Sequence, residues 1–265
     1  MDRRSLAAQC EARLTLMART GTSSKPRKLK QRASLATVRR DIVACERCQE
    51  LRAYCSRIAA ERKREFSAER YWGKPVPSIG NASARLLIMG LAPAAHGGNR
   101  TGRMFTGDGS AVFLARALYR AGFATQPTSI RRHDGFELVD AFMTAALRCA
   151  PPGNRPTPGQ LQKCAGHLRA ELDILNAIRV IVALGRVAFD NIYARLRERG
   201  YAAEKHPAFR HGGEFLLQAP GRSDLILMTS YHPSRQNTNT GKLTQTMLDD
   251  VFSRAKVLVT SGRTC

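Results

Sequence analysis

The sequence predicts an α/β sandwich in which helices pack on a mainly parallel β-sheet. Short apolar segments alternate along the chain with segments whose apolar residues recur at the helical period. Three of the apolar segments run directly into polar, glycine-bearing stretches at 90–109, 149–159 and 231–241. The carboxyl ends of parallel strands share one edge of a sheet, and ligands bind there in such folds. We therefore expect the three stretches to meet at this edge, which we name the strand-end rim.

The first expected element is a long helix at the start of the folded region. Residues 35–64 carry apolar side chains at steps of three, four and six, close to multiples of the helical period. These apolar positions are Leu35, Val38, Ile42, Cys45 and Leu51.

The later elements follow the same alternation. The apolar run at 86–89 stops at Gly90 and predicts a buried strand. Thr157, a favoured N-cap, and Pro158, at the first helical position, mark the start of a later helix. In chain order the segments are strand 84–90, helix 109–123, strand 141–149, helix 157–175, strand 180–185, helix 186–200, strand 224–234 and helix 243–259.

The charge balance indicates the class of partner. The chain has 43 lysines and arginines against 21 aspartates and glutamates, a formal net charge of +22. Charge so far from zero opposes compaction and favours a polyanionic partner. Nucleic acid is the first candidate and an anionic membrane surface the second.

Residues 1–34 are expected to form a flexible basic tail ahead of one folded domain at 35–265. The tail contains GTSSKPRKLKQRAS, in which a basic run lacks any periodic apolar face. No apolar run reaches the roughly 18 residues of a membrane span, and the N-terminus lacks the apolar core of a signal peptide. We therefore expect a cytoplasmic protein.

Residues 90–113 read GLAPAAHGGNRTGRMFTGDGSAVF and contain six glycines. Such a stretch adds little to a hydrophobic core. Its glycines, however, let the backbone approach a ligand closely and adopt positive φ. We interpret the stretch as the lining of a nucleotide pocket, and the alternative is an irregular surface loop.

The cysteines suggest a metal site. Seven cysteines, an odd number, favour metal ligands or free thiols over a disulfide framework. Cys45 and Cys48 stand one helical turn apart in CERC, and Cys149 and Cys164 bracket CAPPGNRPTPGQLQKC. Four thiolates from two segments suit tetrahedral zinc or an iron–sulfur cluster, and the wide second pair favours the cluster. Buried free cysteines are the alternative, and Cys55 could compete as a ligand.

Four features then occur together: the glycine-rich GLAPAAHGGNRTGRMFTGD, the segment RCAPPGNRPTP, the segment SYHPSRQNT and the four spaced cysteines. In this order they resemble the uracil-DNA glycosylase superfamily, and within it the type B, or family 5, iron–sulfur branch. The resemblance runs from about Leu35 to the C-terminus. Any one of these features is weak, whereas all four in order are quite specific.

The resemblance implies a three-layer α/β/α sandwich with a central, mainly parallel four-stranded sheet. It also implies a 4Fe–4S cluster on Cys45, Cys48, Cys149 and Cys164, and excision of uracil from DNA in base excision repair. The type B branch is broader and accepts other deaminated bases such as hypoxanthine. Four bound thiolates would fix the N-terminal helix against the strand-end rim.

His232 and Phe105 are the expected centre of the site. His232 stands at the end of an apolar strand, and cleavage of the N-glycosidic bond leaves negative charge on the departing base, chiefly at O2. A histidine donor there would stabilise that anion. By the resemblance, Phe105 stacks on the extruded base, a contact worth roughly 1–3 kcal/mol. Gly90 and Ala92 complete the expected base-binding set.

Two positions depart from the family pattern. Leu91 stands where related branches carry an acid or amide, and leucine cannot orient water. Asp108 is the nearest carboxylate and the best candidate for that role, although it could equally cap the helix beginning near Gly109. Ala145 stands where relatives place an asparagine that reads uracil, so recognition would depend on backbone groups or on Asn154.

Polar and cationic side chains near the rim are expected to contact DNA. By the resemblance, Arg235 and Gln236 approach the duplex, where they would fill the gap left by the flipped base. Cationic side chains at the rim would bind phosphates and make binding depend steeply on salt. They are Arg100, Arg103, Arg155 and Lys242.

These features predict a monomeric, monofunctional glycosylase that uses water, acts on DNA containing a deaminated base, and is nucleoid-associated in a prokaryote. No lysine falls in the pocket motifs, and Lys242 is the nearest. The apolar Leu91 and Ala145 motivate an alternative, an iron–sulfur protein that binds uracil-containing or single-stranded DNA without turnover. A third reading, a zinc-dependent nucleic-acid protein, requires the thiolates to bind zinc.

Overall fold

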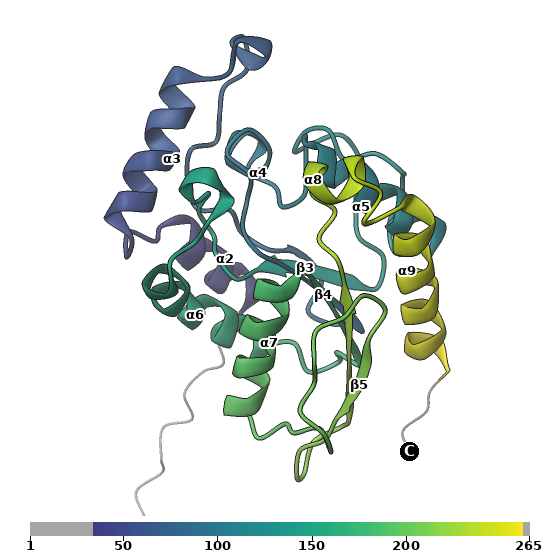
Figure 1. Ribbon diagram of the computed structural model, residues 1–265. Coiled ribbons are helices and arrows are strands. Elements are labelled where there is room, and N and C mark those ends of the chain that lie inside the picture. Colours follow the sequence, from purple (N-terminus) through teal and green to yellow (C-terminus); the bar gives the residue numbers. More distant parts are fainter. Residues whose placement is uncertain (1–33, 262–265) are drawn as a thin grey trace, which may run out of the picture. The chain divides into compact units, whose positions relative to one another are not determined.

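Six strands form one mixed sheet in the order β1-β3-β2-β4-β6-β5 (Figure 1). The computed structural model describes residues 34–261. Its four central strands are mutually parallel, and they are the four that the sequence predicts. They are β3 (Ala141–Ala145), β2 (Leu86–Gly90), β4 (Val180–Leu184) and β6 (Leu225–Ser230).

The expected four-stranded sheet is incomplete, because two short edge strands extend it. β1 (Ile79–Gly80) pairs antiparallel with β3, and β5 (Glu214–Leu217) pairs antiparallel with β6. β1 has only two residues, and β5 contains just one fully buried residue. Neither strand therefore produces the continuous apolar run that identifies a buried strand in a sequence.

Helices cover both faces of the sheet, which confirms the α/β sandwich. One face packs against α5 (Gly109–Arg120) and α9 (Gln245–Thr260), which lie side by side in Figure 1. The other face packs against α6 (Pro158–Leu172) and α7 (Arg186–Glu198).

Strand β2 shows how the two cores are separated. Leu86 and Ile88 belong to the core under α5 and α9, whereas Leu87 and Met89 belong to the core under α6 and α7. Successive side chains of a strand point to opposite faces. Since both faces are covered, every residue of β2 is buried.

The single N-terminal helix predicted over 35–64 is wrong. The segment forms two helices, α2 (Leu35–Val43) and α3 (Gln49–Glu61), and CERC lies in the turn between them. Leu51 of α3 packs in a small separate cluster with Leu147, while α2 contacts α6. Each short helix has its own apolar face. The apolar residues of the two helices therefore recur at the helical period on both sides of the turn, and the sequence gives no sign of the break.

The three polar stretches contain short helices that the sequence did not indicate. They are α4 (Gly98–Thr101) after β2, the 3₁₀-helix η2 (Pro152–Asn154) after β3, and α8 (Arg235–Asn239) after β6. Because β2, β3 and β6 run parallel in the same sheet, all three stretches leave it at the same edge. Figure 1 shows α4 and α8 at that end, next to the start of α5.

The predicted basic tail lies outside the described residues except for Ser34. The Ser34 hydroxyl accepts a hydrogen bond from the Thr37 amide at 3.1 Å and caps α2. Among residues 34–261, none of the helices combines the length and apolar character needed to cross a bilayer.

Candidate active site

The three stretches at the strand-end rim enclose a cavity of about 430 Å³. All three contribute to it, which confirms that they converge. The lining residues are Leu91, Ala92, Pro93, Ala94, Phe105, Asp108, Gly109, Ser110, Asn154, His232, Ser234 and Arg235. We name this space the base cavity.

Phe105 and His232 face each other across the base cavity. Their ring centroids are 6.1 Å apart with an interplanar angle of 34°. Phe105 has φ +45°, in the left-handed region that residues other than glycine rarely occupy. A Cβ on Gly90 would lie only 2.6 Å from Cε2 of the Phe105 ring. Gly90 therefore shapes the cavity by leaving room for this ring.

His232 follows β6 and is held through its own backbone. Its carbonyl oxygen accepts hydrogen bonds from the Asn237 side-chain amide and the Ser234 backbone amide, both at 2.8 Å. Burial lowers the pKa of His232 to about 4. The imidazole is therefore neutral at physiological pH and retains one N–H donor.

Asp108 performs the capping role considered for it. One carboxylate oxygen accepts a hydrogen bond from the Ala111 amide at 2.9 Å and caps α5. The other oxygen lies where a Cβ on Gly97 would be 2.0 Å away, so Gly97 permits this close approach. Burial raises the pKa of Asp108. The same carboxylate lines the base cavity, so the cap does not remove it from the site.

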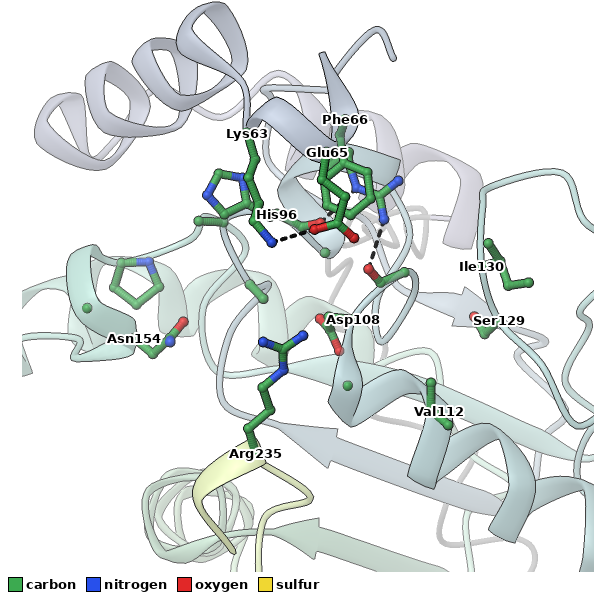
Figure 2. Close-up of a pocket in the computed structure, with 18 of the residues that line it drawn as sticks. Lys63, Glu65, Phe66, His96, Asp108, Val112, Ser129, Ile130, Asn154 and Arg235 are labelled. Carbon is green, nitrogen blue, oxygen red and sulfur yellow. Dashed lines mark hydrogen bonds and ion pairs between the residues drawn. The ribbon is translucent and has the colours of Figure 1, made fainter. Parts of the chain in front are cut away.

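A second cavity of about 660 Å³ adjoins the base cavity. The two share Ala94, Asp108, Gly109, Asn154 and Arg235. Figure 2 shows Arg235 reaching up from α8 toward Asp108, with Asn154 on its other side. Arg235 therefore stands where the two cavities meet.

Arg100 and Arg103 differ from the expectation that they bind phosphate. Arg100 is 4% exposed, and its guanidinium donates to Glu69 at 2.5 Å and to the Gly107 carbonyl at 2.8 Å. Arg103 is 6% exposed and forms an ion pair with Asp134 at 2.7 Å. Both guanidinium groups are used inside the protein, where they hold the loop 97–109 in shape.

The other expected DNA-contacting side chains are accessible. Arg235, Gln236, Lys242 and Arg155 are all exposed. The ammonium of Lys242 lies 5.0 Å from the centre of the Tyr231 ring. These positions leave each side chain free to meet a polyanion at the rim.

The four cysteines predicted as ligands line one small cavity, together with cationic side chains. Cys45 and Cys48 come from the turn between α2 and α3, Cys149 follows β3, and Cys164 lies in α6. Cys55 does not line this cavity; its thiol donates to the Ala150 carbonyl at 3.6 Å.

The spacing of the four thiols distinguishes between a zinc ion and an iron–sulfur cluster. A tetrahedral zinc ion with Zn–S bonds of about 2.3 Å needs its ligands in one tight group. Within residues 34–261, no three His, Cys, Asp or Glu side chains form such a group for one ion. Four thiols arranged around a cavity fit the larger iron–sulfur cluster better. Burial raises the pKa of the Cys164 thiol to about 11.

Comparison with known proteins decides the family. The model described as "Uracil DNA glycosylase superfamily" matches residues 77–256. The chain belongs to this superfamily. A type-5 uracil-DNA glycosylase of Thermus thermophilus is 46% identical over 217 residues, which cover 82% of this chain and 94% of that protein.

Two further members of the superfamily are similar to different extents. A type-5 uracil-DNA glycosylase of Mycobacterium tuberculosis is 46% identical over 218 residues, covering 82% of this chain and 79% of the relative. A type-4 uracil-DNA glycosylase of Archaeoglobus fulgidus is 30% identical over 119 residues, covering 44% of this chain and 52% of the relative. The two relatives named type 5 thus match most of this chain at 46% identity.

The two departures from the superfamily pattern lie in different places. Leu91 lines the base cavity, so an apolar side chain does occupy the wall near Asp108. Ala145 is the last residue of β3, is 1% exposed, and packs in the core under α5 and α9. Ala145 does not line the base cavity, whereas the exposed Asn154 does.

Sequence reasoning missed the side chains that α3 and the turn after it bring to the second cavity. Tyr54, Lys63, Glu65 and Phe66 all line it, and Lys63 pairs with Glu65 at 2.5 Å. His96, from the glycine-rich stretch, joins them (Figure 2). The only signal was a short basic and aromatic run, KREF, at the end of a helical pattern.

Proposed function

We propose that this protein is a uracil-DNA glycosylase that excises uracil from DNA by hydrolysing the N-glycosidic bond. The observation that carries the proposal is the base cavity, in which Phe105 and His232 face each other at 6.1 Å. The relatives named type-5 uracil-DNA glycosylases, at 46% identity over most of both chains, support the same reaction.

The cavity suits a base that has been rotated out of the helix. Such enzymes must extrude the nucleotide to reach its glycosidic bond. Phe105 would stack on the base, contributing roughly 1–3 kcal/mol. Asn154 and the backbone at Gly90 and Ala92 would read the edge of the base.

His232 would stabilise the departing base. As the bond between C1′ and the base nitrogen breaks, the bonding electrons move onto the base, and negative charge develops at O2. The neutral imidazole donates a hydrogen bond to this oxygen without having to transfer its proton. A preorganised donor of this kind accounts for about 10²–10³ in rate in other enzymes.

Asp108 would act on the sugar side of the bond. Its carboxylate can orient the attacking water or offset the positive charge that develops on the sugar, and Leu91 can do neither. Among the described residues, no lysine lines the base cavity, and Lys63 lies in the second cavity with Glu65. Water, rather than a lysine amine, is therefore the proposed nucleophile.

The cofactor is proposed to be a 4Fe–4S cluster held by Cys45, Cys48, Cys149 and Cys164. In that position it would join the turn between α2 and α3 to the end of β3 and to α6. Its role would be structural, because binding free energy of this kind stabilises the fold that forms the site.

A second candidate function is binding without turnover. The apolar Leu91 in the cavity wall favours it, since the group that positions water is not found at that place. In this reading the protein holds uracil-containing or single-stranded DNA and releases no base. We propose the glycosylase first because Asp108 lines the same cavity.

One assay separates these possibilities. The purified protein is incubated with duplexes containing uracil, hypoxanthine or a thymine mispair, and free base and abasic sites are measured. We expect release of uracil, and of hypoxanthine if the cavity is permissive, without strand cleavage by the protein itself. If the protein retains the uracil duplex but frees no base, the second candidate function, binding without turnover, is the correct one.

A further inference from the structure

Arg148 is the largest fully buried side chain described, yet it is only partly hydrogen-bonded. It is 1% exposed and stands between the end of β3 and Cys149. Its Nη2 donates to Glu171 at 2.6 Å, and the same carboxylate oxygen accepts from the Thr144 hydroxyl at 2.7 Å. Nε and Nη1 have no hydrogen-bond partner among the described residues.

This arrangement is costly unless something else meets the two free donors. A buried ion pair often fails to repay its desolvation, even when its remaining donors are satisfied. Each buried donor left without a partner adds a further penalty. Native proteins therefore rarely leave such groups unpaired, and an exception points to a ligand, an ion or water.

The surroundings of Arg148 indicate which ligand this is. Arg148 lines the same cavity as all four cysteines. Four thiolates and their cluster carry net negative charge, so the cavity would present acceptors to the guanidinium.

The other cations of this cavity have alternatives that Arg148 lacks. Arg47 and Lys163 are exposed to solvent. Arg52 donates to the Gly73 carbonyl at 3.0 Å and to Glu46 at 3.3 Å. Only Arg148, among the cations lining the cavity, is both fully buried and left with unpaired donors.

We propose that Arg148 is the residue that positions and tunes the cluster, with Nε–H and Nη1–H donating to its sulfur ligands. Glu171 and Thr144 hold the guanidinium from behind, so the donors are already oriented before the cluster binds. The inference depends on the proposed cluster. Because Arg148 lies outside the base cavity, its proposed role is that of a positioning residue.

The test compares Arg148→Met with Lys163→Met, which removes an exposed cation from the same cavity. For each protein, iron content, the rate of iron loss to a chelator, the cluster's midpoint potential and the unfolding midpoints with and without iron are measured. Arg148→Met should lose iron about tenfold faster, equivalent to about 1.4 kcal/mol. Its potential should become more negative, because hydrogen bonds to the sulfurs stabilise the reduced cluster. Lys163→Met should stay within about twofold of the unsubstituted protein.

A second variant guards against simple misfolding. Arg148→Met with Glu171→Met removes both buried charges, which folded proteins often tolerate. It should keep the unfolding midpoint of the iron-free protein and still lose iron about tenfold faster. Unchanged iron loss and potential in both variants would overturn the inference and leave Arg148 as a partner of Glu171 alone. A purified protein without iron or sulfide would overturn the cluster itself, a result that the uracil assay does not depend on.

Discussion

Gly90 determines where the Phe105 ring can lie, and so determines the shape of the base cavity. The role of such a glycine is hard to recognise from sequence. Gly90 acts by lacking a side chain, and the ring that needs this space belongs to a residue fifteen positions later. The sequence did indicate that the glycine-rich stretch lines a pocket. The contact that needs Gly90 became visible only in the fold.

Gly90→Ala should therefore damage the site more than the fold. Its new methyl group would sit 2.6 Å from the Phe105 ring and push it into the cavity. We expect uracil release to fall at least about tenfold and stability to fall by about 1–3 kcal/mol, the usual cost of overpacking. The control is Gly159→Ala in α6, where a Cβ meets nothing within 4 Å. Normal activity in Gly90→Ala would show that the ring position is unimportant.

His232→Ala tests the donor to the departing base. Removing one such donor should lower the rate of uracil release by about 10²–10³ and leave affinity for the uracil duplex within about tenfold. Single-turnover kinetics and a binding titration measure the two effects. His206→Ala, an exposed histidine that packs edge-on against Tyr193, is the matched control and should release uracil normally. Loss of affinity with an unchanged single-turnover rate would assign His232 to binding.

Arg100 and Arg103 show why loop arginines are misassigned from sequence. Both lie in a glycine-rich loop of a very basic chain, where phosphate contact is the natural reading. Their partners, Glu69 and Asp134, come from segments about 31 residues away on either side. A sequence without its fold does not reveal such pairings. The two guanidinium groups were therefore expected to bind phosphate, whereas they form ion pairs inside the protein.

Asp108, at the start of α5, has both a structural position and a place in the site, because it caps the helix and lines the base cavity. The sequence left these roles open, and they are compatible. One carboxylate oxygen accepts from the Ala111 amide, and the other lies beside Gly97, which lines the second cavity. The helix thus supplies a fixed carboxylate where Leu91 supplies none.

Asp108→Ser and Asp108→Ala separate the two roles. Serine is also a favoured N-cap, so Asp108→Ser should keep the unfolding free energy within about 0.5 kcal/mol, whereas Asp108→Ala should lose about 1 kcal/mol. Both lack the carboxylate and should release uracil at least about tenfold more slowly, by the loss of a charged group near the sugar. Urea unfolding and uracil release measure the two effects. An active Asp108→Ser would reduce Asp108 to a cap.

The elements themselves were predicted where burial left a strong pattern. The central strands were found because both faces are covered and their residues are continuously apolar. The edge strands β1 and β5 were missed because they are short or partly exposed. The break at CERC was missed because α2 and α3 each keep a helical apolar face. The second cavity depends on the turn after α3, whose contacts with the 96–109 loop are not visible in the sequence.

His167 and His232 make the stability of the whole protein depend on pH. Burial lowers the pKa of His167, which is 4% exposed, and of His232 to about 4, against an ordinary value near 6.5. Below pH 6.5 the unfolded chain binds protons that the folded protein does not bind until about pH 4. Stability should therefore fall between pH 7 and pH 5, by about 2 kcal/mol for His167 and by less for the partly exposed His232.

Urea unfolding at pH 7 and pH 5 tests this dependence. His167→Gln removes one of the two groups, so it should lose about 2 kcal/mol less than the unsubstituted protein on acidification. The comparison uses the change with pH within each protein, so any constant cost of the substitution cancels. An equal change in both proteins would mean that His167 does not titrate differently in the folded state.

The large positive charge of the chain should appear as salt-dependent DNA binding, and Arg235 should contribute to it through one phosphate contact. The logarithm of the binding constant falls with the logarithm of salt concentration by about 0.9 for each phosphate contact. In a His232→Ala background, which prevents base release during the titration, Arg235→Ala should lower the slope by about 1. Arg197, exposed in the last turn of α7, lies away from the strand-end rim, because α7 runs back from the end of β4. Arg197→Ala should therefore leave the slope unchanged. Equal slopes in both variants would show that DNA is bound by general attraction to the basic surface, and Arg235 would then have no specific place at the rim.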